Sequence, residues 1–377
     1  MTGLIFSTKA FSFLDKSTES RVSRVDGLRF FLAIFVALHH YVLSYEHFNN
    51  KPWKLDSISD YPINLKIGSF GVALFFMISG YVFSNIKTVS WTTFYKKRFL
   101  RIAPMFTISS ALCLTLAFIS QKHGFDSSDL ISKIYFWFDS GLTGNKPDLF
   151  GVANTRYINA GVAWTLFYEW AFYFSLPLIY IFREKMGAIP LTVSILFFAI
   201  YILSNQSQSY ASFVSFFAIG FLSHELPRHI SLSKITCDIS ASLLFIATLL
   251  MVNDSYNIYF LPIIGSLFIL ISLGSDFFGL LTIRGFIRLG DASYSIYLLH
   301  GIAWYCMNKI AFTYIITITH TSYMLVSSIT FLALLLICSA TYKFIEMPCI
   351  NLSKRNNKQK ISMRNHIKTT ESSSSET

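Results

Sequence analysis

The sequence predicts an all-α, polytopic integral membrane protein that forms a single domain with about ten transmembrane helices. Three observations predict this fold. Of the 377 residues, 53% are hydrophobic and only 14% are charged, whereas soluble domains carry about 25% charged residues. Long apolar stretches recur along the chain, most of them about long enough to cross a bilayer. The Lys and Arg residues behind the net charge of +11 gather in short segments between these stretches.

Several function classes are disfavoured by what the sequence lacks. No basic face or recognition module is visible, so the positive charge does not indicate nucleic-acid binding. The five cysteines are scattered singly, which predicts neither a disulfide framework nor a metal site. The sequence has no Gly-x-Ser-x-Gly, no phosphate-binding P-loop motif and no His-Glu-x-x-His. We therefore expect neither a metal ion nor a nucleic-acid partner.

The apolar stretches divide the chain into ten expected spans. Residues 1–23 are expected to form a cytoplasmic leader, 24–350 the transmembrane domain, and 351–377 a disordered, basic and Ser-rich cytoplasmic tail. The expected spans are 27–46, 66–86, 102–120, 161–182, 188–204, 210–223, 235–252, 256–273, 292–311 and 322–345. With ten spans both termini lie on one side. If that side is the cytoplasm, inner segments carry about 22 Lys and Arg and outer segments about 6, as the positive-inside rule requires.

The first span carries two ionisable groups that a bilayer normally rejects. Arg29 lies near its start and His40 lies eleven residues later. At about 100° per residue both point to nearly the same side of a helix, roughly 16 Å apart along its axis. Such residues are costly in a membrane and indicate function. An imidazole suits proton abstraction from a hydroxyl, so His40 is either a base or a packing residue, whereas His39 is expected to pack or to contact headgroups.

Two further groups of charged residues are candidates. Arg98 and Arg101 are three residues apart, so they share a helix face. Together with Arg29 they would suit a phosphate or pyrophosphate, and the alternative is anchoring to lipid headgroups. Glu169 lies inside the fourth span, where a carboxyl must be paired or protonated. It is expected to accept a hydrogen bond from a histidine, to pair with an arginine or to carry a proton.

Four other features have a structural interpretation beside the functional one. His300, inside the ninth span, is either a hydrogen-bonding residue or part of a site. Ser79 beside Gly80 favours close helix packing over a nucleophile. Glu346 is expected to cap the last helix. The long segment 121–160, with aromatic residues at 135–138, favours either sugar contact or a membrane-interface belt.

Six blocks in order resemble the membrane-bound acyltransferase family 3, which includes O-acetyltransferases of bacterial surface polysaccharides. The resemblance covers about residues 22–350. The blocks are Asp26-Gly-Leu-Arg29 with Arg29-x10-His40, Gly71 to Gly80, Arg98-Phe-Leu-Arg101 with Pro104, Trp164 to Tyr173, Ser293 to His300, and Phe344 to Pro348. The chain departs from the family at Trp170, where many members have a second acid, at Ala73, and at Thr165 in place of serine.

The resemblance implies transfer of an acyl group, most often acetyl, from cytoplasmic acetyl-CoA to a hydroxyl of a lipid-linked or cell-surface polysaccharide, such as O-antigen (lipopolysaccharide) or exopolysaccharide. It implies a multi-pass protein of the bacterial cytoplasmic (inner) membrane. Arg29, Arg98 and Arg101 would hold the phosphates of coenzyme A, and His40 would act as the base. We expect Glu169 to orient His40 or to stabilise its charged form. Further candidates are Trp164, Ser79 and His300.

Two alternatives stay open. The acceptor could be something other than a surface polysaccharide, such as a peptidoglycan sugar, an antibiotic or a lipid. The chain could instead be a proton-coupled transporter or flippase, with Arg29, His40 and Glu169 as a proton relay. The sequence shows no inverted repeats and no pairs of Gly- or Pro-broken helices, which argues against a transporter. The expected partners are acyl-CoA, a sugar acceptor and membrane lipids.

Overall fold

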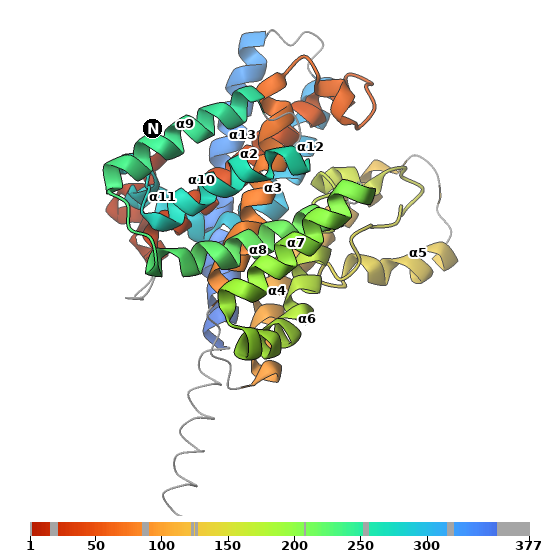
Figure 1. The fold of residues 1–377 in the computed structure, drawn as a ribbon. Helices are drawn as coiled ribbons and strands as arrows, with labels where there is room; N and C mark the ends of the chain where they lie inside the picture. Colours follow the sequence, from red (N-terminus) through yellow and green to blue (C-terminus); the bar gives the residue numbers. More distant parts are fainter. Residues whose placement is uncertain are drawn as a thin grey trace, which may run out of the picture.

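A computed structural model shows one all-helical body (Figure 1). It describes residues 2–15, 22–84, 90–121, 124, 127–206, 209–251, 256–314 and 320–352. Most of the predicted tail, from residue 353 on, lies outside the described residues, as do residues 16–21 of the predicted leader. Within the described ranges, six helices are long and apolar enough to cross a membrane, which confirms the prediction of a polytopic all-α membrane protein.

Ten of the described helices overlap the ten expected spans, and the helix over the expected span 102–120 begins earlier, at Trp91. Their bounds are α2 (Ser23–Phe48), α3 (Pro62–Phe83), α4 (Trp91–Ser120), α6 (Ala163–Met186), α7 (Ala188–Gln206), α8 (Ser209–Glu225), α9 (Lys234–Met251), α10 (Leu261–Leu273), α12 (Ser293–Tyr314) and α13 (His320–Thr341). The six that meet the length and composition of a span are α2, α3, α4, α6, α9 and the continuous segment Thr321–Leu352. Helix α10 has 13 residues and rises only about 20 Å, less than the hydrocarbon core of a bilayer.

Helix α2 lies at the centre of the body. It packs against α3, α12 and the short helix α11 (Arg284–Asp291), so most of its length is covered by other helices. Figure 1 shows α9 and α10 side by side, lying across the α2 and α3 pair. Because α2 runs without a break from Ser23 to Phe48, Arg29 and His40 share one uninterrupted helix. The fold therefore keeps the geometry that their spacing predicts.

Helices α3 and α8 approach each other through two glycines. A Cβ at Gly80 would stand 2.1 Å from the carbonyl oxygen of Phe217, and one at Gly220 would stand 2.1 Å from that of Met77. Larger residues would push the helices apart, since no real Cβ contact is that short. The close packing predicted for the Ser79–Gly80 pair is therefore found at Gly80.

The N-terminal residues are folded onto the body. Helix α1 (Thr2–Ser7) and the turn η1 (Lys9–Leu14) pack on α11, which lies between the expected spans 256–273 and 292–311. Arg288 of α11 is buried and donates to the carbonyls of Phe6 and Thr8, each at 2.7 Å. Its guanidinium also pairs with Asp15 at 2.7 Å, as does Arg284. These bonds hold the pKa of the Asp15 carboxyl well below its usual range.

Residues 127–160 form a cap that contains α5 (Ser127–Lys133) and the turns η3 (Ile134–Trp137) and η4 (Thr155–Asn159). Trp137 is fully buried and donates to the carbonyl of Pro147 at 3.0 Å. Lys146 is buried as well and donates to Asp139 and to the Phe136 carbonyl, each at 2.6 Å. Burial lowers the pKa of Lys146, and the bond to Asp139 opposes that shift. The cap is thus held by an internal ion pair and a buried tryptophan.

Candidate active site

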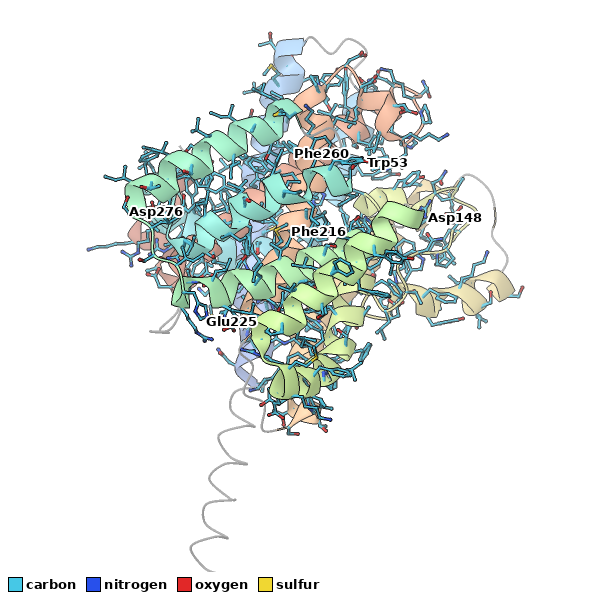
Figure 2. All side chains as sticks on the ribbon, viewed as in Figure 1. Trp53, Asp148, Phe216, Glu225, Phe260 and Asp276 are labelled. Carbon is cyan, nitrogen blue, oxygen red and sulfur yellow. The ribbon has the colours of Figure 1, made fainter. Side chains whose placement is uncertain are left out.

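Two cavities lie along α2. The larger, of about 560 Å³, contains Arg29, and we call it the basic cavity. The smaller, of about 400 Å³, contains His39, His40 and Trp53, and we call it the histidine cavity. Figure 2 labels Trp53 and Asp148 on the right of the view and Asp276 and Glu225 on the left. The histidine cavity lies at the end marked by Trp53, under the cap and the segment 49–61.

The basic cavity collects most of the predicted charged residues. Arg29 comes from α2, Arg98 and Arg101 from α4, and Glu169 from α6. The structure therefore brings together three arginines that lie up to 72 residues apart in the chain. Ser79 lines the same cavity from α3. Other polar residues on its wall are Lys97, Thr165, Tyr173, Asp291, Ser293, Tyr294 and Tyr297.

The three arginines differ in how their charge is compensated. Arg29 pairs with Asp26 at 3.4 Å and Arg101 pairs with Glu346 at 3.3 Å. The guanidinium carbon of Arg98 lies 5.0 Å from the centre of the Phe83 ring, and no ion pair joins it to a described carboxylate. Its Nε is buried and has no hydrogen-bond partner among the described residues. A buried donor without a partner is uncommon and fits a site that receives an anion.

Glu346 is a site residue that the sequence prediction treated as a helix cap. It lies on the π-helical turn η8 (Tyr342–Glu346) that continues α13. It is 1% exposed, faces Arg101, and accepts a hydrogen bond from Ser295. π-Helical turns occur often at functional sites because the extra residue redirects a side chain. The position of Glu346 at the expected end of the last helix did not indicate that its carboxylate would contact Arg101.

Glu169 does not lie beside His40. Its carboxylate accepts a hydrogen bond from Tyr173, one turn along α6, and lines the basic cavity. Among the residues the structure describes, no hydrogen bond joins Glu169 to either histidine of the smaller cavity. Glu169 was expected to orient the His40 imidazole, but no described hydrogen bond supports this role. The face of α6 that carries Glu169 turns toward the arginines instead.

The partner of His40 is His300 of α12. Nδ1 of His40 lies 3.0 Å from Nε2 of His300, and Nδ1 of His300 lies 3.1 Å from the carbonyl oxygen of Ile296. A carbonyl only accepts, so a neutral His300 carries its proton on Nδ1 and offers Nε2 as an acceptor. His40 must then donate from Nδ1, which leaves its Nε2 unprotonated. This assignment follows from the hydrogen-bond partners, and it makes Nε2 of His40 the basic atom.

The neighbouring His39 has a different environment. It is 7% exposed, and its Nδ1 lies 2.7 Å from the carbonyl oxygen of Asn64 on α3. The amide of Asn64 in turn donates to the carbonyl of Leu38 at 2.8 Å. Gly68 lets the His39 ring approach α3, since a Cβ there would stand 2.5 Å from it. His39 thus joins α2 to α3, as its predicted packing role implies.

Aromatic rings cover His40 on the cap side. The Trp53 ring stacks at 6.2 Å on His40, and the Tyr157 ring stacks at 4.8 Å on Trp53. On its other side His40 stacks on His300, with ring centres 5.1 Å apart. Trp164, at the start of α6, also lines the cavity. The aromatic residues 135–138 are not among its lining residues, whereas Tyr157 of the same segment and Trp53, neither of which the sequence analysis singled out, are.

A thin wall separates the two cavities. Thr165 and Tyr297 share a hydrogen bond of 2.7 Å and both line the basic cavity. The Tyr297 ring lies 6.0 Å from the His300 ring, which contacts His40. Trp164 faces one cavity and Thr165 the other. The path from the arginines to His40 is therefore interrupted by a few side chains of α6 and α12.

Comparison with known proteins gives one match. A protein-family model described as an acyltransferase domain matches residues 22–343. No curated protein and no solved structure matches the chain. The matched range contains every predicted site residue and ends three residues before Glu346. Within the described part of the chain, no group of three or more His, Cys, Asp or Glu side chains is arranged to hold a metal ion.

Proposed function

The chain belongs to the acyltransferase 3 family, and from this premise we propose that it transfers an acetyl group from acetyl-CoA to a sugar hydroxyl across a membrane. The acceptor is a lipid-linked or cell-surface polysaccharide, such as an O-antigen or exopolysaccharide sugar. The observation that carries the proposal is the pair of cavities on α2, with arginines at one end and a histidine base at the other.

The orientation follows from charge. With both termini in the cytoplasm, the basic cavity opens on the side where acyl-CoA is made, and the histidine cavity faces outward. The basic residues at the start of α4 and the start of α2 then lie on the inner side. The membrane would be the bacterial cytoplasmic membrane, because the acceptor class belongs to bacterial surfaces.

At the inner end, the arginines and Lys97 would bind the phosphates of acyl-CoA. Arg98 offers a buried donor without a partner, and guanidinium groups match phosphate geometry well. Arg29 and Arg101 are held in place by carboxylates at 3.4 and 3.3 Å, distances that leave room for exchange with a stronger acceptor. The long pantetheine arm separates the phosphates from the thioester. Acyl-CoA bound with its phosphates at the arginines could therefore place its thioester near Tyr297, on the side of the basic cavity that faces His40.

At the outer end, His40 would remove the proton of the acceptor hydroxyl. The alkoxide oxygen forms a C–O bond to the thioester carbonyl carbon, and the C–S bond breaks. The proton on Nε2 of His40 then passes to the coenzyme A thiolate. His300 keeps accepting from Nδ1 of His40 throughout, because the imidazolium donates from both nitrogens. His300 is thus a positioning residue for the base.

Membrane vesicles with the cytoplasmic face outward test this function. They would come from a bacterium that lacks its own copy and expresses the full chain. Labelled acetyl-CoA is added, and ester-linked acetate on lipid-linked and surface glycan is measured by NMR. We expect ester that depends on the chain and on acetyl-CoA. Labelled glycan that moves across the membrane without gaining ester would instead support a flippase and contradict the proposal.

A further inference from the structure

The histidine cavity carries several basic residues, although in the proposed orientation it lies on the outer side of the membrane, where few are expected. Lys54, Lys146 and Arg156 line it, and no Asp or Glu is among its described lining residues. Lys146 is already neutralised by Asp139 at 2.6 Å. Lys54 and Arg156 have no carboxylate partner in the described part of the chain. Two uncompensated cations therefore stand at the mouth of the cavity that contains His40.

Arg156 is positioned by neutral groups. Its Nη1 donates to the side-chain oxygen of Asn145, and its guanidinium carbon lies 5.3 Å from the centre of the Tyr157 ring. Both contacts orient the side chain without cancelling its charge. Tyr157 stacks on Trp53, and Trp53 stacks on His40. The same stack of rings thus joins a fixed guanidinium to the base.

The positive-inside rule predicts few basic residues on the outer side, so cations gathered there indicate a local function. In the proposed orientation the outer segments carry six Lys and Arg residues, which are Lys51, Lys54, Lys122, Lys133, Lys146 and Arg156. Three of the six line this one cavity. Because outer segments of membrane proteins carry few basic residues, a local concentration there calls for a ligand of opposite charge.

We propose that the histidine cavity selects an acceptor sugar that carries a negative charge, a carboxylate or a phosphate, close to the hydroxyl that is acylated. The anion binds Arg156 and Lys54, and the sugar ring packs against the aromatic lining. The acceptor hydroxyl then faces Nε2 of His40. This inference rests on the proposed acyl transfer and names the acceptor class; the anionic group itself is unchanged in the reaction.

A binding experiment tests the charge without needing transfer. The purified full chain in nanodiscs of zwitterionic lipid is titrated with three probes, glucose, glucuronate and glucose 6-phosphate. Binding is followed by tryptophan fluorescence, and Trp53→Phe identifies the part of the signal that comes from the cavity. We expect a Trp53-dependent response to one or both anions at concentrations where glucose gives none. A response to only one anion tells carboxylate from phosphate. Equal responses to all three probes, or none to any, overturn the proposal.

A matched pair of variants locates the charge. Arg156→Gln should weaken anion binding about tenfold, the effect of losing a charge-assisted hydrogen bond of about 1.4 kcal/mol. Lys51→Gln is the control, because Lys51 is another basic residue of the outer segments but pairs with Glu46 at 2.8 Å and does not line the cavity. Equal losses in both variants would mean that only general surface charge attracts the anion, and the site would be refuted. A probe response that phosphatidylglycerol in the nanodisc abolishes would assign the cations to a lipid headgroup instead, with the same consequence.

Transfer assays separate this inference from the proposed function. Oligogalacturonate and its carboxyl-reduced counterpart, in which each carboxylate is replaced by a hydroxymethyl group, are offered as acceptors with acetyl-CoA, and ester on the ring hydroxyls common to both is compared. Preference for the charged form supports the inference. Equal transfer to both acceptors would support the proposed acyl transfer and refute the selectivity for a charged acceptor. Charge-selective probe binding without transfer to any glycan keeps the anion site and refutes the proposed function.

Discussion

Two arginines of the basic cavity, Arg29 and Arg101, are held differently from Arg156 of the histidine cavity. In the basic cavity, Arg29 and Arg101 face Asp26 and Glu346, so each of these charges has a carboxylate before any ligand arrives. In the histidine cavity, Arg156 is held by an amide and an aromatic ring and keeps its full charge. Inside a membrane protein, a cation that pairs with a carboxylate costs less free energy than an unpaired one, which is stable only near water. Because both cavities open to the surface, the difference lies in the partners of these cations.

The largest effect should come from the base. His40→Gln is expected to lower acyl transfer about 10² to 10⁴-fold, because the variant loses the imidazole that is proposed to take the proton of the acceptor hydroxyl. Ester-linked acetate per folded protein is the measurement. His39→Gln is the matched control, since His39 bonds the Asn64 carbonyl and should mainly affect thermal stability. Normal transfer by His40→Gln would remove the histidine cavity from the chemistry.

The next effect should appear at the basic cavity. Arg98→Gln is expected to raise the KM for acetyl-CoA about 10- to 100-fold with little change in kcat, because a charge-assisted bond of about 1.5–3 kcal/mol to phosphate is lost. Lys96→Gln is the control: Lys96 is an exposed residue of the same basic stretch and does not line the cavity. If both variants raise KM equally, Arg98 acts only through general surface charge.

A smaller effect should come from His300. His300→Phe removes the acceptor for Nδ1 of His40 and is expected to lower kcat about tenfold, the effect of about 1.4 kcal/mol, with the KM for acetyl-CoA unchanged. His300→Gln offers an amide oxygen in its place and should restore part of the rate. Failure of the glutamine to exceed the phenylalanine variant would show that His300 only fills space.

The smallest effect on transfer is expected outside both cavities. Asp15→Asn should leave transfer unchanged and lower the unfolding free energy by about 1 kcal/mol, a value limited by solvent screening since Asp15 is 37% exposed. Because Arg288 and Arg284 lower the pKa of Asp15, its contribution is complete at neutral pH and is lost on acidification. The difference in unfolding temperature between wild type and variant should therefore be largest at pH 7 and should shrink below about pH 4. A constant difference would refute the carboxylate's role.

Local patterns predicted much of the basic cavity. The spacing of Arg98 and Arg101 places both on one face of α4, and the spacing of Arg29 and His40 places both on one side of α2. Helical periodicity reaches no further than its own helix. It could not show that Glu346 would meet Arg101, because their contact joins α4 to the π-helical turn after α13. For the same reason it left three roles open for Glu169, whose carboxylate lines the basic cavity with the arginines.

The sequence alone determined the all-α membrane class, the approximate positions of the long apolar helices and the common side of Arg29 and His40 on one helix, because hydropathy and a 3.6-residue period are local properties. Only the tertiary structure decided which nitrogen of His40 is basic, since that depends on His300, 260 residues away. It also decided that Trp53, Tyr157 and Arg156 gather over His40. Contacts between distant segments arise from how the helices pack and where the loops fold back, and no local pattern encodes them.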